Sequence, residues 1–487
     1  MSDVEFVDQT LRDGQQSLWG MRMRAGMIAP VAEEIDQAGY RVVDLTASSL
    51  MEVVLRYCHE DPFEGLDLIR SLFPLTPLRS ASRSNCIAKF GLTPVSLMEL
   101  WVRTLVRHGI RSFWIYDCLY NMDAMEHLSR VAHGEGADVA AAVMFGVSPV
   151  HTDEWFAERV REMASWGSVS SIYVEDAPGI LTPERARTLM PALVAAAGGL
   201  PLEMHCHNTT GLAPLNYVEA LNAGVRILHT ASEPLANGPS LPSIEATLEN
   251  LRWLGYTSSI DSSRLPGIAR HFHRVGEQEG YALGAPVEYQ VFPYHHQLPG
   301  GMTGTLKAQL AEYQMESRLI EVLEEVVRVR AELGHPISAT PFSQLMGIQA
   351  VLNVVTGDRY SIVPDEVIMY VYGHLGEPPA PLDGDVLDRI VSSPRGRELA
   401  RFEPPQPSLP ELRAQYGGSH LSDEELLLRY LVPEADIAAA RAAGPLRRSY
   451  PTDVPPAVIA LLKELATLTH TDYVHVTRPG FDFTARR

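Results

Sequence analysis

The sequence predicts an α/β fold: a (β/α)8 TIM barrel followed by a mostly helical C-terminal domain. Between residue 4 and about residue 255, short apolar runs alternate with polar loops and with segments of helical period. The pattern repeats about every 30 residues, which is the length of one β-α unit. The apolar runs give eight expected strands, at residues 4–8, 42–45, 78–82, 112–116, 138–145, 171–175, 202–207 and 227–231.

The segments between these runs support the same fold. Several predicted helices end on a glycine just before the next strand, at Gly39, Gly109 and Gly224, where a left-handed residue stops a helix. The alternative is an open, doubly wound sheet, which would place a glycine-rich phosphate loop after the first strand. Residues 13–16, Asp-Gly-Gln-Gln, are not such a loop. A closed barrel carries its chemistry at the carboxyl ends of the strands.

The alternation of strands and helices stops after Trp253. We expect a metal-binding catalytic barrel over residues 1–255 and a helical domain over residues 256–403 that completes the active site. Residues 286–305 look irregular, and residues 306–333 have helical spacing of apolar positions. Residues 404–410 are proline-rich and predict a linker, and the tail to residue 487 receives no role.

Composition narrows the function classes. The chain has 487 residues and a formal net charge of −20, which argues against nucleic acid or an anionic membrane as a general partner. Its four cysteines are scattered without C-x-x-C pairing, so no disulfide framework is expected. The first residues lack a signal peptide, and no apolar run reaches the roughly 20 residues of a membrane span. These features predict a cytoplasmic protein.

A metal site is predicted at the end of the seventh strand. His205 and His207 are one residue apart, so both imidazoles leave the same face of the strand. Such a pair is half of a site for Zn, Co or Mn, although the pair alone is also compatible with two unrelated polar residues. Asp13, just after the first strand, is the expected third ligand, and an N-cap or turn role is its alternative.

Further polar residues follow other strands of the barrel. Arg12 would place a fixed charge where an enolate oxygen develops, and a surface ion pair is its alternative. Glu175 is a candidate fourth metal ligand, and Asp176 a candidate group for orienting a ligand. Two more candidates complete the set: Arg83 as a clamp for a substrate carboxylate, and Asp44 as the group that positions Arg12.

Several longer motifs resemble the biotin-dependent carboxyltransferase family, which includes pyruvate carboxylase, the oxaloacetate decarboxylase α chain and the transcarboxylase central subunit. The barrel motifs lie at residues 11–24, 59–62, 148–152 and 205–211, and those of the second domain at residues 296–301, 340–344, 348–357, 364–368 and 376–381. The resemblance covers roughly residues 5–400. More distantly, the barrel is similar to metal-dependent lyases such as hydroxymethylglutaryl-CoA lyase and to isopropylmalate synthase.

The resemblance implies a site and an activity. Asp13, His205 and His207 match the family's metal ligands, while Arg12 and Gln16 match residues around the keto acid. Arg83 matches the arginine that follows the third strand. The implied reaction is decarboxylation of a keto acid such as oxaloacetate to a metal-stabilised enolate, with the carboxyl group passed to biotin. Family members assemble as dimers or larger, so a homo-oligomer is expected.

The chain departs from the family pattern at four places. Glu175 stands where the family has a lysine that becomes carbamylated and binds the metal, and its side chain is shorter. Residues 47–50 and 83–86 differ from the family's pocket motifs. The strand-8 segment lacks the threonine that shuttles a proton in pyruvate carboxylase, and Ser240 is the nearest hydroxyl.

These departures leave three hypotheses. In the first, the chain is a carboxyltransferase served by a separate biotin carrier protein, because it has no Ala-Met-Lys-Met biotinylation site, no biotinyl domain and no ATP-binding signature. In the second, it is a biotin-independent metal-dependent lyase, decarboxylase or condensing enzyme. In the third, it is an inactive scaffold that binds a carrier protein.

Overall fold

The computed structural model describes residues 3–88, 91–300 and 314–450, together with residues 302, 306, 310, 311, 464, 465, 473–478 and 481–486. All eight predicted strands are present, with ends that shift by one or two residues. They are β1 (Asp3–Asp8), β2 (Val42–Ala47), β3 (Leu78–Arg83), β4 (Ile110–Tyr116), β5 (Asp138–Met144), β6 (Ser171–Asp176), β7 (Leu202–Cys206) and β8 (Ile227–Thr230).

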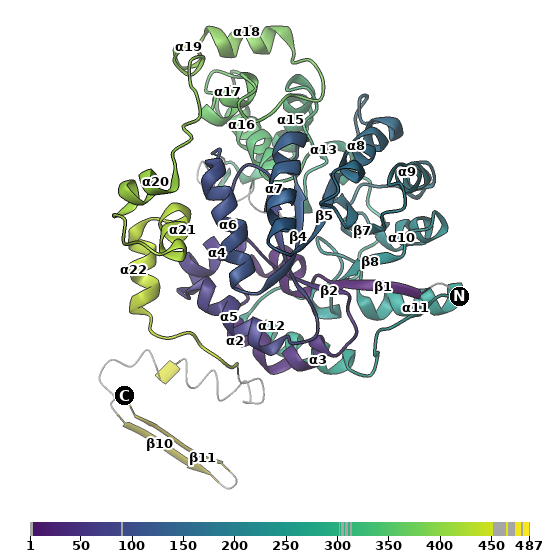
Figure 1. Ribbon diagram of the computed structural model, residues 1–487, viewed down its shortest axis with the longest axis vertical. Helices are drawn as coiled ribbons and strands as arrows, with labels where there is room; N and C mark the ends of the chain where they lie inside the picture. The colour runs from purple at the N-terminus through teal and green to yellow at the C-terminus, as the bar shows by residue number, and fades with distance from the viewer. Residues whose placement is uncertain are drawn as a thin grey trace.

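The strands form a closed parallel barrel (Figure 1). Each strand pairs with the next in chain order from β2 to β8, β8 pairs with β1, and β1 pairs with β2. This last pairing closes the ring and confirms the barrel over an open sheet. A short strand, β9 (Thr257–Ser258), joins the start of β1 from outside the ring. The surrounding helices are α3 (Ala32–Asp36), α5 (Pro62–Leu72), α6 (Val95–Arg107), α7 (Met122–Gly134), α8 (Asp153–Ser165), α9 (Pro183–Ala196), α10 (Ala213–Asn222) and α11 (Ile244–Leu254).

Periodicity explains why these segments fold as they do. Strands β2, β6 and β7 are buried at every residue, as expected for parallel strands covered on both faces. Helix α6 instead buries one stripe, which contains Leu97, Trp101 and Leu105 at intervals of four residues. The periodicity of apolar residues in each segment therefore agrees with the residues that the segment buries.

A helical second domain follows the barrel. Its elements are α12 (Leu265–Glu279), α13 (Pro293–His296), η5 (Glu316–Arg318), α15 (Leu319–Glu332), α16 (Phe342–Thr356), α17 (Asp365–Val371), α18 (Gly384–Ser392) and α19 (Pro394–Leu399). Helices α15 and α16 pack against each other, and α12 packs on α3. The helix predicted at residues 306–333 is confirmed from Leu319 onward, and much of its first part lies outside the described residues.

The second domain binds the loop that follows β5. The Gln297 amide donates to the Val147 carbonyl oxygen (3.0 Å) and accepts from its N–H (3.1 Å). The Arg330 guanidinium donates to the same carbonyl oxygen from 2.9 Å. These bonds hold the domain at the carboxyl end of the barrel, where the sequence places the site.

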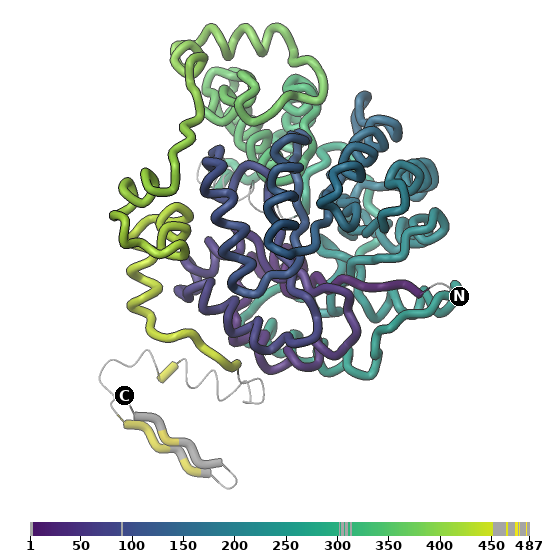
Figure 2. The backbone as a smooth tube through the Cα atoms, in the orientation of Figure 1, coloured from purple at the N-terminus to yellow at the C-terminus, as the bar shows by residue number. Residues whose placement is uncertain are grey.

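Beyond the second domain the chain returns to the outside of the barrel (Figure 2). The Gln406 side chain accepts a hydrogen bond from the Val95 N–H (2.9 Å), and Ser96 donates to the Pro407 carbonyl oxygen (2.8 Å). Three helices follow, α20 (Leu409–Tyr416), α21 (Asp423–Leu431) and α22 (Glu434–Ala442), and a hairpin of β10 (Tyr473–Arg478) and β11 (Phe481–Arg486). Helix α21 packs on α6, and α22 packs on η3 (Val54–Cys58). Within the described part of the chain, no helix has the length and apolar character that crossing a membrane requires.

Candidate metal centre

Three buried side chains meet at the carboxyl end of the barrel. Asp13 lies in η1 (Thr10–Gly14), a π-helical turn after β1, while His205 lies in β7 and His207 just beyond it. One oxygen or nitrogen atom from each side chain lies within 4.8 Å of the other two. Asp13 Oδ2 is 3.2 Å from His205 Nε2 and 3.4 Å from His207 Nε2. The structure therefore brings together the three predicted ligands.

The His207 ring has a fixed orientation. Its Nδ1 donates to the Pro239 carbonyl oxygen from 2.6 Å, which turns Nε2 toward Asp13. Metal-binding histidines usually hold their second nitrogen in this way. Burial lowers the pKa of His207, but the Asp13 carboxylate outweighs that effect and raises it to about 9. The Asp13 pKa stays well below its ordinary value, because the Arg12 and His207 charges outweigh its burial.

The raised pKa of His207 makes cation binding depend on pH. Below about pH 9 the free protein carries a proton on His207 Nε2 that a cation must displace, whereas burial lowers the pKa of His205 to about 3. We expect the affinity for Mn²⁺ to rise about tenfold per pH unit toward pH 9 and then to level off. Titration calorimetry at several pH values measures this slope, and a flat affinity between about pH 6 and pH 8 contradicts it.

Arg12 lies directly beside the three ligands. Its guanidinium contacts the Asp13 carboxylate and lies over the Trp114 ring, 4.9 Å from the ring centroid. Asp44 does not hydrogen-bond Arg12, contrary to the expectation from the sequence. Its Oδ2 accepts from Gln9 Nε2 (3.1 Å) and Trp114 Nε1 (3.0 Å). Asp44 thus orients the ring on which Arg12 stacks, and it acts on Arg12 through charge.

Glu175 lies next to the three ligands, outside the group that their close ligand atoms form. It pairs with His205 across β6 and β7, yet the three-ligand group found among the described residues does not include it. In that part of the chain Glu175 Oε2 is buried and has no hydrogen-bond partner. Burial raises the Glu175 pKa to about 7, against the opposing charge of Arg12. As placed, Glu175 acts on the site through its charge, and its role as a fourth direct ligand stays a prediction.

We expect Glu175→Gln to weaken Mn²⁺ binding only about fivefold, because a nearby charge contributes on the order of 1 kcal/mol. The measurement is Mn²⁺ affinity by calorimetry at a fixed pH above the Glu175 pKa of about 7, where the side chain is ionised, with Glu175→Asp as the charge-retaining control. A loss of more than about a hundredfold in Glu175→Gln would instead identify a direct metal bond.

The other predicted residues have more varied positions. Asp176 accepts from the backbone N–H groups of Ile180 (3.0 Å) and Leu181 (2.7 Å), so it shapes the turn after β6 and does not orient a ligand. The Ser240 hydroxyl is buried and donates to the Leu235 carbonyl oxygen (2.7 Å), which does not support a proton-shuttle role. Gln16 is partly buried in α1 (Gln15–Trp19), three residues after Asp13 in the sequence.

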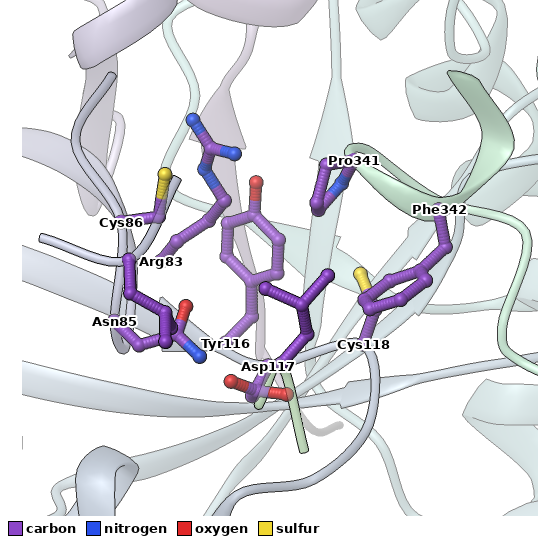
Figure 3. A pocket seen from close by; sticks show the side chains of 10 residues that line it. Arg83, Asn85, Cys86, Tyr116, Asp117, Cys118, Pro341 and Phe342 are labelled. Atoms are coloured by element: carbon purple, nitrogen blue, oxygen red, sulfur yellow. The ribbon is translucent and has the colours of Figure 1, made fainter. Parts of the chain in front are cut away.

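Arg83 lines a pocket between the barrel and the second domain (Figure 3). Tyr116 and Cys118 line it from the barrel side, and Pro341 and Phe342 from the second domain. Two segments that are compared with family motifs, residues 83–86 and 340–344, therefore meet in one pocket. The contact between Arg83 and a substrate carboxylate stays a prediction.

Sequence reasoning missed the polar side chains inside the barrel below the ligands. They are Gln9, Arg79, Trp114, Tyr173, Glu203 and His229, all fully or almost fully buried. The signal that could have found them is alternation: Glu203 and His205 are two residues apart on β7, as are Tyr173 and Glu175 on β6, so each pair shares a face.

The closed barrel with an Asp-His-His group at its mouth defines a class of (β/α)8-barrel enzymes with a candidate metal centre. Residues 120–270 match the HMGL-like family model, and residues 294–445 match the conserved carboxylase domain. A pyruvate carboxylase subunit of Methanocaldococcus jannaschii is 33% identical over 444 residues, which cover 90% of this chain and 78% of the relative. The chain belongs to the biotin-dependent carboxyltransferase family, and it is an enzyme of the carboxyltransferase type.

Other relatives agree with this assignment. The 2-oxoglutarate carboxylase large subunit of Hydrogenobacter thermophilus is 32% identical over 459 residues, covering 91% of this chain and 69% of the relative. The methylmalonyl-CoA carboxyltransferase 5S subunit of Propionibacterium freudenreichii is 28% identical over 453 residues, covering 91% and 89%. The carboxyl transferase domain from Rhizobium etli pyruvate carboxylase with pyruvate is 23% identical and superimposes with a TM-score of 0.83, covering 99% of this chain and 83% of that chain.

Proposed function

We propose that this enzyme moves a carboxyl group between a 2-keto acid and biotin held on a separate carrier protein, with a divalent cation at Asp13, His205 and His207. The observation that carries the proposal is this buried ligand group with the Arg12 charge directly against it. The relatives from the three organisms are carboxylase or carboxyltransferase subunits, two of them named for pyruvate or 2-oxoglutarate. We take oxaloacetate and pyruvate as the substrate pair to test first.

The ligand set fits a divalent cation. One carboxylate oxygen and two imidazole nitrogens suit Zn, Mn or Co. His205 Nε2 is buried and faces Asp13 Oδ2 at 3.2 Å, so the two candidate ligand atoms are close enough to hold one cation. A cation held there would polarise the keto oxygen of the substrate.

The chain's own residues would supply the rest of the chemistry. When the bond between the carboxyl carbon and the adjacent carbon of the keto acid breaks, its electron pair stays with the remaining fragment as an enolate. The Arg12 guanidinium, fixed over Trp114, would be a permanent positive charge beside the oxygen of this enolate. Asp13 is 1% exposed and His205 is 0% exposed, so the charges act where little water screens them. Arg83 would hold the substrate carboxylate from the neighbouring pocket.

Biotin would then have to arrive from outside the barrel. The sequence has only three lysines, Lys89, Lys307 and Lys463, and none lies in a biotinylation motif. All three lie outside the described residues. The pocket between the barrel and the second domain is the entrance we propose for a biotinyl group on its carrier. We further propose a cytoplasmic enzyme that forms a homo-oligomer.

The comparisons fit a carboxyltransferase and not the biotin-independent lyase or the inactive scaffold. The deciding experiment is oxaloacetate decarboxylation by purified, Mn²⁺-loaded protein with and without free biotin. We expect biotin to accelerate pyruvate release, because the carboxyl group then has an acceptor. A biotin analogue that lacks the reactive ureido nitrogen is the control. An unchanged rate at saturating biotin, with activity present without it, would contradict the proposal and favour the lyase.

A further inference from the structure

A line of buried polar side chains runs through the barrel below the metal centre, from Arg79 on β3 through Glu203 on β7 and His229 on β8 to His205. Arg79 is 3% exposed, and the other three are 0% exposed. Because they are sealed from solvent, these groups must satisfy one another, and their proton positions can be deduced from their partners.

The line begins with an ionised carboxylate. Arg79 donates to Glu203 from both terminal nitrogens, at 2.5 and 3.0 Å, and Ser171 donates to Glu203 Oε1 from 2.6 Å. Burial opposes ionisation, but the Arg79 charge outweighs it and holds the pKa of Glu203 well below its ordinary value. Glu203 can therefore only accept hydrogen bonds.

That carboxylate determines where His229 carries its proton. His229 Nε2 lies 3.0 Å from Glu203 Oε2, so Nε2 must be the N–H. On the other side, His229 Nδ1 lies 3.0 Å from Gln9 Nε2, whose amide also donates to Asp44 Oδ2. Because the Gln9 amide donates to Nδ1, the ring carries one proton and is neutral, and burial lowers its pKa in the same sense. Two independent partners thus assign a lone pair to His229 Nδ1.

The same reasoning passes to the metal ligand. His205 Nδ1 lies 3.2 Å from His229 Nδ1 and 2.6 Å from the Tyr173 hydroxyl. Two lone pairs facing each other at this separation would repel, which favours a proton on His205 Nδ1. Asp13 Oδ2 faces the other ring nitrogen, Nε2, from the same 3.2 Å and competes for that proton. A cation held by Asp13 and His205 would take the Nε2 lone pair, and the proton of the ring would then lie on Nδ1, facing His229. Behind its Nδ1, His207 has a backbone carbonyl, whereas His205 has another ring.

We propose that Glu203 and His229 are a positioning pair that draws the proton of His205 to Nδ1, against the competing Asp13 carboxylate, and so favours cation binding at Nε2. The pair touches neither substrate nor cation, and it acts through His205 alone. This inference rests on the proposed metal centre. Tyr173 is the competing partner, since its hydroxyl could hold His205 without help from His229.

Two substitutions at His229 distinguish its contact with Glu203 from its contact with His205. In His229→Gln the amide reaches the position of Nε2 and still satisfies Glu203, but nothing faces His205. In His229→Asn the amide oxygen stays near the position of Nδ1 and can still accept from His205. We expect His229→Gln to weaken Mn²⁺ binding about 10- to 100-fold, the usual effect of removing a partner behind a metal ligand. His229→Asn should recover part of that loss.

Tyr173→Phe is the matched control, because it removes the other partner of His205 Nδ1 and leaves His229 in place. We expect it to change Mn²⁺ affinity less than His229→Gln does. The reverse order, with full loss in Tyr173→Phe and none in His229→Gln, would overturn the proposal. Circular dichroism and urea unfolding of each variant exclude a general loss of fold.

The proton position itself can be measured without metal. In ¹⁵N-histidine-labelled, metal-free protein, we expect the His205 resonances, assigned by their loss in His205→Gln, to show a population with the proton on Nδ1 beside the population with the proton on Nε2 that Asp13 favours. In His229→Gln the Nδ1-protonated population should fall. The same populations in the wild type and in His229→Gln would overturn the proposal even if Mn²⁺ binds. A wild-type protein that binds no cation would instead overturn the metal centre, and the spectrum would still test the positioning pair.

Discussion

Asp13→Asn is expected to lower kcat/KM for biotin-dependent oxaloacetate decarboxylation by about a thousandfold, which corresponds to about 4 kcal/mol of lost stabilisation. Asp13 contacts every other charged or ligand side chain of the group: its Oδ2 faces both His205 and His207 and also contacts Arg12. An amide removes the single negative charge among the three ligands. It also presents an N–H₂ group to the same three partners. Steady-state kinetics and metal analysis by mass spectrometry measure the two effects together.

The control for this substitution is Glu5→Gln on β1, the strand that precedes Asp13. Glu5 forms a surface ion pair with Arg41 at 2.7 Å, and its side chain is 45% exposed. Removing that charge should leave both cation content and activity unchanged, because exposed ion pairs contribute little. Full cation content and wild-type kcat/KM in Asp13→Asn would exclude the Asp-His-His group as the working centre.

The barrel was predictable because its signals are local. Eight apolar runs of strand length, each followed by a helical period, leave few ways to arrange the chain, and β1 pairing with both β8 and β2 is the closed solution. His205 and His207 were predictable for the same reason, since two residues of extended chain put two rings on one face. Asp13 followed from its place after β1, because all strand ends of a parallel barrel meet at one rim.

The position of Glu175 relative to the three ligands could not be predicted from the sequence and required the folded structure. A position on β6 fixes the direction of its side chain, but whether a carboxylate reaches the metal depends on separations of an ångström or two. The structure places Glu175 beside His205 in register and outside the three-ligand group. Strand position alone does not distinguish a direct ligand from a neighbouring charge.

The polar interior was not predictable because its contacts cross the barrel. Arg79 on β3 and Glu203 on β7 are 124 positions apart and on strands that do not pair with each other, yet they form a bidentate ion pair. In the sequence, each looks like an ordinary polar residue within an apolar run. The return of α21 and α22 to the barrel is similar: helical spacing predicts a buried face, but not the element that covers it.

The Arg79–Glu203 pair carries the largest stability prediction. Arg79→Met is expected to lower the free energy of unfolding by about 3–5 kcal/mol, because it leaves the Glu203 carboxylate buried without its countercharge. The side chains are 3% and 1% exposed, so water cannot replace the lost partner. The change is measured as a shift of the urea unfolding midpoint at pH 7, with the slope of the transition compared between variants.

A double variant separates loss of the pair from loss of packing. Glu203→Gln added to Arg79→Met removes the stranded charge and keeps a side-chain oxygen for Ser171 and His229. We expect the double variant to regain much of the lost stability. Leaving one buried charge without its partner costs more free energy than the complete ion pair contributes to stability. An Arg79→Met protein within about 1 kcal/mol of wild type would mean that Glu203 takes up a proton or finds water. In that case its carboxylate could not dictate the proton of His229, and the proposed positioning pair would fail with it.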